Sequence, residues 1–169
     1  MIWILRPGQD ARYLDKFLLD NRVYIPWDGY KVSLESCNER EDFRAIVTEE
    51  KGELNRTTLS NWSGQLYSFC KEMVVGDFVM IPHRHSHKYV LAEIVSGYGY
   101  DDTQEELRHY RDVRVVANDI PQDIFSQNVR YSLGAFRTLF KVKHIDEVVS
   151  AIIKFAPETA EHLKTEVTA

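Results

Sequence analysis

The chain has 169 residues, of which 44% are hydrophobic and 12% aromatic, and its formal net charge is -5. This length fits one domain with a sizeable core, and the charge excludes a polycation that binds nucleic acid over its whole surface. Cys37 and Cys70 are too few for a metal knuckle or a disulfide framework, and the first residues lack the pattern of a signal peptide. Since no apolar run approaches the roughly 18 residues of a membrane span, we expect a reduced, cytoplasmic protein with no membrane partner.

The first half of the chain is expected to contain two strands and three helices. The strands cover residues 1–6 (MIWILR) and 22–27 (RVYIPW), and residues 10–21 between them have helical spacing. A second helix is expected over residues 40–54, where apolar side chains form a stripe. A third helix begins at about Thr57, with a Thr or Ser as its cap.

The middle of the chain changes to the period of a sheet. Residues 76–84 and 87–100 read as two strands joined by a short loop at Ser86, and residues 111–119 read as a third. This pattern indicates an antiparallel hairpin that continues into a small barrel.

The last part of the chain completes the predicted domain. A short helix is expected within residues 120–135, a closing strand over 136–143 and an amphipathic helix over 145–157. Residues 158–169 are polar and are expected to be a frayed end or a linker. The fold class is therefore α+β, a bent barrel flanked by helices, in one domain that covers residues 1–157.

Several aromatic residues stand at strand ends and turns, where a closed core does not need them. Trp27, Tyr30, Tyr98 and Tyr100 are of this kind, and polar neighbours such as Asp28 are available beside them. A pocket that stacks a flipped base on aromatic rings and reads its edge through hydrogen bonds uses these residue types. The alternative for each tyrosine is a half-buried position in the barrel.

The segment NWSGQLYSF, residues 61–69, is expected to have two helical faces. Trp62 belongs to the face that enters the core, while Asn61 and Gln65 lie on a polar face, and Ser63 with Gly64 would let another chain come close. A glycine inside a helix costs roughly 1 kcal/mol relative to alanine, which favours a reason for its presence. The alternative is plain packing of the helix on the barrel.

The loop HRHSHK, residues 83–88, is rich in basic and imidazole side chains. Alternate histidines on a hairpin match the period of a metal site, but no nearby carboxylate or cysteine completes it. A second interpretation is contact with phosphates through Arg84, His85 and Lys88. A third is a solvated loop with no ligand, and we expect no metal and no cofactor.

A catalytic site is not expected. Asp28, Glu49 and Lys51 superficially match the carboxylates and lysine of a metal-dependent nuclease, but the spacing around Glu49 is helical, and that chemistry needs a strand beside the aspartate. The sequence shows neither a Ser-His-Asp nor a Cys-His arrangement, and no phosphate loop.

Six blocks give the chain a family resemblance over about residues 1–143. In order they are YIPW, NWSGQLYSF, VGDFVMIP, YVLAEIVSGYGYD, HYRDVRVV and YSLGAFRTLFKV. Their order resembles the PUA-like domain, related to EVE and YTH domains, at the N-terminus of Mrr-like restriction endonucleases and related defence proteins. Pro26 stands where that family often has glycine before the Trp27 position.

The resemblance implies a reader of modified DNA. Its barrel accepts a modified base, such as a methylated one, flipped out of the helix, and a nuclease domain or subunit cuts the DNA. Together with the aromatic pattern, it gives a predicted pocket of Trp27, Asp28, Tyr30, Asn61, Trp62, Ser63, Tyr98 and Tyr100. Two alternatives stay open, which are YTH-like binding of modified RNA and a small hydrolase of the ASCH type with Asp28 as its acid.

Overall fold

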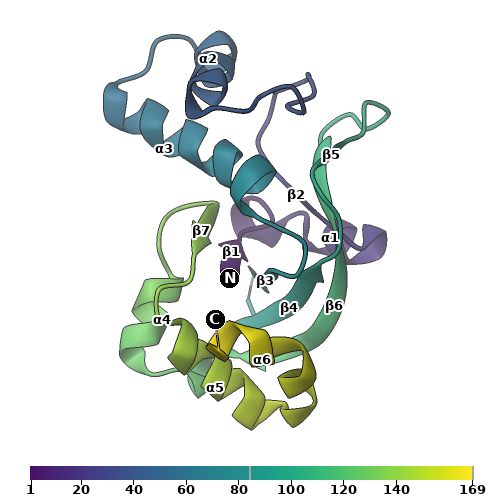
Figure 1. Ribbon diagram of the computed structural model, residues 1–169, viewed down its shortest axis with the longest axis vertical. Helices are drawn as coiled ribbons and strands as arrows, with labels where there is room; N and C mark the ends of the chain where they lie inside the picture. The colour runs from purple at the N-terminus through teal and green to yellow at the C-terminus, as the bar shows by residue number, and fades with distance from the viewer. Residues whose placement is uncertain (84, 169) are drawn as a thin grey trace.

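A curled, mixed β-sheet forms the centre of the molecule. The computed structural model describes residues 1–83 and 85–168, and the sheet has the strand order β2-β6-β4-β3-β1-β7, with the short β5 paired to β6 (Figure 1). The strands are β1 (Ile2–Leu5), β2 (Arg22–Tyr24), β3 (Phe78–Pro82), β4 (Lys88–Ile94), β5 (Gly99–Tyr100), β6 (His109–Pro121) and β7 (Leu139–Lys141). The pair β1–β3 is parallel and the other pairs are antiparallel.

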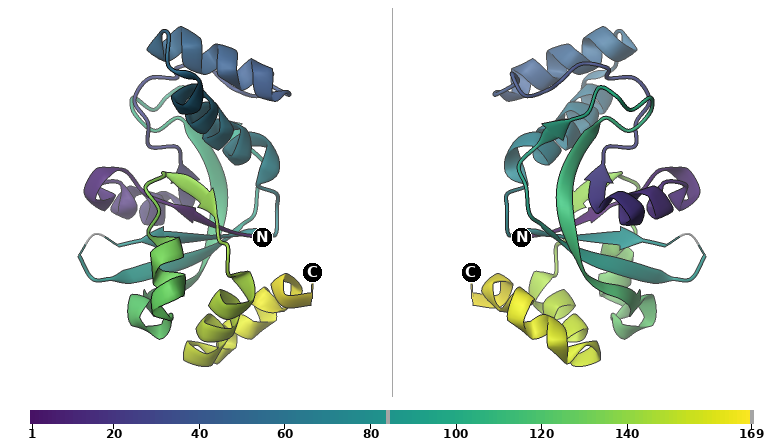
Figure 2. Two further views of the ribbon diagram at one scale, coloured as in Figure 1. Left: turned by 90° about the vertical axis from the view of Figure 1, so that its left-hand side faces the viewer. Right: turned by 90° about the vertical axis from the view of Figure 1, so that its right-hand side faces the viewer.

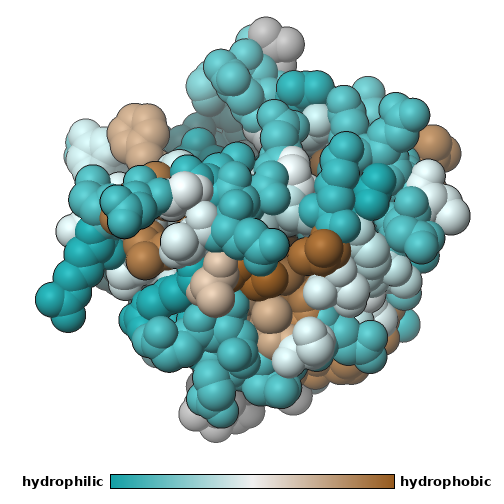
Figure 3. All heavy atoms as spheres, turned by 90° about the horizontal axis from the view of Figure 1, so that it is seen from above, coloured by the Kyte–Doolittle hydropathy of each residue, from teal (hydrophilic) through white to brown (hydrophobic). Residues whose placement is uncertain are grey.

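Helices lie at both ends of the sheet. The α-helices are α1 (Leu14–Asp20), α2 (Arg40–Lys51), α3 (Arg56–Tyr67), α4 (Gln127–Leu133), α5 (Ile145–Phe155) and α6 (Ala160–Thr168). In Figures 1 and 2, α2 and α3 stand at one end and α4, α5 and α6 at the other. The face with α2 and α3 is hydrophilic over most of its area, and its hydrophobic side chains gather in small areas (Figure 3).

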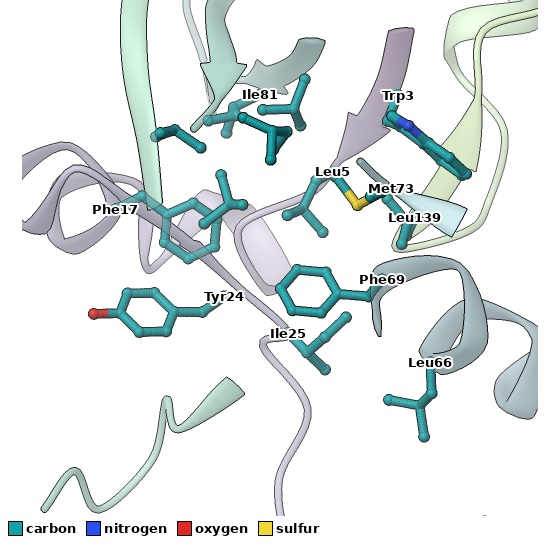
Figure 4. Close-up of a cluster of buried hydrophobic side chains, with 14 of the residues drawn as sticks. Trp3, Leu5, Phe17, Tyr24, Ile25, Leu66, Phe69, Met73, Ile81 and Leu139 are labelled. Atoms are coloured by element: carbon teal, nitrogen blue, oxygen red, sulfur yellow. The ribbon is translucent and has the colours of Figure 1, made fainter. Parts of the chain in front are cut away.

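The sheet is buried on both faces and separates two cores. In β1, Trp3 and Leu5 point into one cluster, and Ile2 and Ile4 point into the other. The first cluster contains side chains of α1, α3, β1, β2 and β7 (Figure 4), and the second packs against α4, α5 and α6. Because successive side chains of a strand face opposite sides, burial on both sides requires the continuous apolar run IWIL.

The helix α3 begins and ends on polar contacts that fix its position. Its cap is Asn55, and not a threonine or serine, because the Asn55 Oδ1 accepts a hydrogen bond from the Thr58 N–H at 2.9 Å. The helix continues into a π-helical turn, Ser68–Glu72. The buried Arg111 guanidinium donates to the carbonyls of Phe69 and Met73, both at 2.8 Å, and so satisfies groups that the end of a helix leaves open.

The two outer strands, β2 and β7, do not pair with each other within the part of the chain that the structure describes. The resulting seam is bridged by side chains. The Trp27 Nε1–H donates to Thr138 Oγ1 at 3.1 Å, and the Leu139 N–H donates to the Gln65 Oε1 of α3 at 2.9 Å. The α+β class and the curled sheet are thus as expected from the sequence. Among the described residues the sheet does not close between β2 and β7.

Several expected segments differ from the structure, and β2 and β7 are shorter than the strands expected over residues 22–27 and 136–143. Residues 158–168, expected to be a frayed end or linker, form the turn Pro157–Thr159 and α6, because Leu163 is fully buried in the second core. The hairpin strands are also shorter than expected. β3 ends at Pro82 and β4 begins at Lys88, so His83, His85 and His87 lie in a loop and not along one strand face.

Candidate functional site

A pocket of ≈380 Å³ lies at the seam of the sheet, between the loop after β2, the helix α3 and the loop before β7. Its lining residues are Pro26, Trp27, Asp28, Tyr30, Lys51, Asn61, Trp62, Gln65, Phe136, Arg137 and Thr138. Five of the eight residues that the sequence predicts for a base pocket are among them. The structure thus brings together residues from four parts of the chain, including Lys51 at the end of α2, at the place where the sheet does not close.

Aromatic rings form much of the pocket wall. The ring centroids of Trp27 and Tyr30 are 6.1 Å apart with planes at 43°, and Trp62 enters from α3. The Trp27 indole is fixed by its bond to Thr138 and by packing against the first core. Phe136 is fully exposed at the mouth. A fixed indole beside open space is suited to stacking, since its position is already determined before a ligand arrives.

The turn that carries Trp27 and Tyr30 is held in a demanding conformation. Tyr30 has φ 51° and Gly29 has φ 85°, so both lie in the left-handed region. At Gly29 the positive φ favours glycine, and an added Cβ, 1.8 Å from the present position of the flexible Glu50 carboxylate, would require that side chain to move. Such backbone conformations cluster at ligand sites, where the surrounding structure has to enforce them.

A buried chain of hydrogen bonds enforces this turn. The Leu34 N–H donates to the Tyr98 hydroxyl at 3.0 Å, and the Tyr98 hydroxyl lies 2.6 Å from His109 Nδ1. His109 Nε2 lies 2.6 Å from the Tyr30 carbonyl oxygen, which can only accept, so Nε2 carries the proton and Nδ1 accepts from Tyr98. Burial lowers the pKa of His109, which keeps the imidazole neutral in this arrangement.

Two of the predicted pocket residues, Tyr98 and Tyr100, therefore lie outside the pocket lining. Tyr98 stacks on His109 at 5.9 Å between centroids, and Tyr100 packs on the same ring at 5.0 Å. Neither lines the pocket, and both support the turn from behind. Ser63 does not line it either, because its buried hydroxyl donates to the Leu59 carbonyl at 2.7 Å within α3.

The polar edge of the pocket is oriented by one amide. The Leu139 N–H can only donate, so the acceptor that it contacts is the Gln65 Oε1, and the Gln65 Nε2 then donates to Asn61 Oδ1 at 3.0 Å. The Asn61 amide N–H groups are left without a protein partner among the described residues. The pocket consequently offers a hydrogen-bond donor from Asn61 and an acceptor from the Asp28 carboxylate.

The tyrosine hydroxyl of the pocket stays protonated. Burial raises the pKa of Tyr30 to about 12, and the nearby Glu50 carboxylate acts in the same direction. The Lys51 Nζ lies 5.6 Å from the centre of the Tyr30 ring. A phenolate nucleophile or base is therefore disfavoured at neutral pH.

The nuclease-like set from the sequence is not assembled. Asp28 and Lys51 line the pocket, whereas Glu49 lies exposed on α2 and is not part of the lining. Across residues 1–83 and 85–168, no group of three or more His, Cys, Asp or Glu side chains is placed to hold a metal ion.

The described residues of the hairpin loop do not line this pocket. His83 Nε2 lies 3.3 Å from the Asn118 carbonyl oxygen, and Lys88 Nζ lies 3.9 Å from the Asp119 carboxylate. His85 is exposed, and Arg84 lies outside the described residues. Contact of this loop with phosphates stays a prediction.

The fold and the site together define a class of α+β protein, with a curled mixed sheet and an aromatic pocket at the open seam. The model of a family described as a domain of unknown function (DUF8426) matches residues 3–143, so the chain belongs to that family. A search of curated proteins finds no match to the chain. All pocket residues lie within the matched segment, whereas α5 and α6 lie beyond it.

A membrane-spanning helix is not found. In the portion of the chain that the structure describes, none of the helices combines the length and the apolar character needed to cross a bilayer.

Proposed function

We propose that this protein is a nucleic-acid reader whose seam pocket takes up one modified base, such as a methylated base, flipped out of DNA. The observation that carries the proposal is the meeting of Trp27 and Trp62, from two separate elements, around an oriented amide in one pocket. The curled sheet with flanking helices supports a PUA-like barrel as the fold. In this proposal the protein acts in the cytoplasm, and a nuclease domain or subunit cuts the DNA.

The size of the pocket supports a ligand no larger than a nucleotide. Its ≈380 Å³ lies near the lower end of the range of about 300–1,000 Å³ that small-ligand sites occupy. A flipped base needs flat apolar walls and a few hydrogen-bonding groups at its edge. Trp27 and Trp62 provide the first, and Asn61 and Asp28 provide the second.

The lining chemistry favours binding over catalysis. The titratable side chains among the described lining residues are Asp28, Tyr30, Lys51 and Arg137, and they include no hydroxyl or thiol nucleophile paired with a histidine. A reader needs no such pair, because stacking and hydrogen bonding to the base provide the affinity. Cleavage by a partner is therefore the proposed division of work.

Binding to a panel of oligonucleotides tests the proposal. DNA duplexes with one N6-methyladenine, one 5-methylcytosine or no modification are titrated by fluorescence anisotropy, beside single-stranded RNA with one N6-methyladenine. We expect one modified duplex to bind more tightly than the unmodified one. Trp62→Ala should weaken that binding by about 1–3 kcal/mol, the usual contribution of one stacked base.

The controls separate a pocket effect from loss of the fold. Phe155→Ala removes an exposed aromatic side chain on α5, far from the seam, and should leave the preference unchanged. Asn61→Ala tests the polar edge without removing an aromatic ring. Equal affinity for every duplex would contradict the proposal, preference for the RNA would favour the YTH-like alternative, and formation of a product would favour the hydrolase.

A further inference from the structure

A second and larger hollow, of ≈620 Å³, adjoins the seam pocket and shares three lining residues with it. Asn61, Gln65 and Arg137 line both spaces, so a molecule bound in the pocket can extend into this hollow without leaving the surface. The hollow runs between α3 on one side and β7 with the end of α4 on the other. Because the hollow lies beside the aromatic pocket, its charged side chains can contact a ligand whose base is bound in that pocket.

The hollow is strongly cationic although the protein is acidic. Among its described lining residues, four side chains are positive, namely Arg40, Arg137, Lys141 and Lys143, and Glu72 is the one carboxylate. Glu72 is already engaged, since it contacts Lys141 at 3.2 Å and Arg40 at 3.9 Å. Arg137 and Lys143 have no acidic partner within the part of the chain that the structure describes.

The shape of the hollow leaves room for a polymer. A Cβ on Gly64 would meet only Arg40 Nη1, at 4.0 Å, so the surface of α3 is open there and not pressed against another part of the protein. Tyr131 is 73% exposed at the rim, and its hydroxyl is held by the Gln127 amide at 2.9 Å. An exposed, oriented ring beside a basic groove is the combination that single nucleic-acid strands use.

The hollow on the other side of Trp27 has a different character. It measures ≈370 Å³, and its charged lining residues are Arg6, Arg137 and Asp10, so it has two positive side chains against four in the larger hollow; the Arg6 Nη2 already donates to the Ala135 carbonyl at 2.7 Å. Phosphates are therefore favoured on the side of Lys141 and Lys143 and not on this one.

We propose that the cationic hollow holds the phosphodiester backbone of the strand that carries the bound base, so that the ligand is an oligonucleotide and not a free nucleoside. This inference rests on the proposed reader function, because the pocket and the hollow are taken to hold parts of one molecule. Arg137 lies at the junction of the two and contacts the phosphate next to the base, and Lys141 and Lys143 contact phosphates further along.

The salt dependence of binding tests this assignment. The probe is a fluorescein-labelled thymidine oligonucleotide of about twelve nucleotides, which covers a typical single-strand site. Each phosphate contact on a single strand contributes about 0.7 to the slope of log K against log salt concentration. The double variant Lys141→Gln, Lys143→Gln should therefore reduce the slope by about 1.4, and each single variant by about half of that.

The matched control is Lys154→Gln, which removes the same charge from an exposed position on α5. An equal loss of slope in this control, or an unchanged slope in the double variant, would overturn the assignment. Thymidine 5′-monophosphate should compete only weakly with the oligonucleotide, and competition at equal concentrations would also overturn it. A uridine oligonucleotide of the same length shows whether the hollow distinguishes RNA from DNA.

The experiments distinguish a wrong assignment of the hollow from a wrong assignment of the pocket. If only the assignment of phosphates to the hollow is wrong, the protein still prefers a modified duplex, but the slope of log K against log salt concentration does not depend on Lys141 and Lys143. If only the assignment of the base to the pocket is wrong, the protein shows no preference for a modified duplex and Trp62→Ala does not change its affinity. The salt-dependence slope then still depends on both lysines.

Discussion

Replacing Gln65 should disturb both the closure of the seam and the polarity of the pocket. The Gln65 amide is 7% exposed, accepts from the Leu139 N–H and donates to Asn61 Oδ1. Gln65→Met keeps a similar volume but removes both contacts, so the buried Leu139 N–H loses its acceptor. A buried donor without a partner costs about 1–3 kcal/mol.

The expected shift is large enough to measure. For a domain of this size each kcal/mol corresponds to about 2–4 °C, so Gln65→Met should lower Tm by about 2–12 °C. Circular dichroism during heating provides the measurement, and Gln127→Met, at an exposed position on α4, provides the control. A Tm within about 1 °C of the unchanged protein would refute the reasoning, because it would mean that Leu139 needs no acceptor.

The conservative change Gln65→Glu separates the two roles. A carboxylate still accepts from the Leu139 N–H but cannot donate to Asn61, so the Asn61 amide turns to donate to it. The Asn61 oxygen then faces the pocket in place of the N–H groups. We expect the order of affinities for differently modified duplexes to change, and an unchanged order would show that Asn61 does not contact the base.

Three further predictions concern the supports of the pocket. Because burial lowers the pKa of His109, the unfolded chain binds more protons below about pH 6.5, and the free energy of unfolding should decrease as the pH falls below that value. Urea denaturation at several pH values measures this, and His109→Gln should flatten the dependence. Arg111→Met leaves buried carbonyls unsatisfied and should cost about 3 kcal/mol or more in the same denaturation assay, so a smaller loss would contradict the role of Arg111. Gly29→Ala should lower Tm mainly through its positive φ, so Glu50→Ala in the same chain should restore little of the loss, and full recovery of Tm would contradict this assignment.

The sequence predicts local structure well because each helix and strand carries its own periodic pattern. The helix α5 and the hairpin of β3 and β4 follow from apolar spacing, although each of these elements is shorter than expected. The tail is misjudged because it is mostly polar, although Ala160, Leu163 and Val167 have helical spacing, and the buried Leu163 anchors α6 in the second core. The parallel pairing of β1 with β3 depends on contacts between distant segments.

Candidate site residues are predicted correctly where the local sequence is informative. They are missed where contacts between separate segments determine which residues line the pocket. Trp27 is found because an aromatic side chain beside a strand end is informative by itself, and Asn61 is found because it lies on the polar face of an expected helix. Tyr98 lies behind the turn and not in the pocket, and its partner His109 is distant in the sequence. Phe136 and Arg137 are missed, although an aromatic and a basic residue next to a Gly-Ala turn give a usable signal of exposure.

The indole signals of the three tryptophans test the central claim most directly. Trp27 and Trp62 line the pocket, whereas Trp3 is 2% exposed, has its indole N–H bonded to Asp77 and lines the adjoining hollow. In a titration of 15N-labelled protein with the tightest-binding modified duplex, we expect the indole signals of Trp27 and Trp62 to shift more than that of the buried Trp3. Binding that leaves both pocket signals unchanged would contradict the account, because the base would then be held elsewhere or not flipped at all.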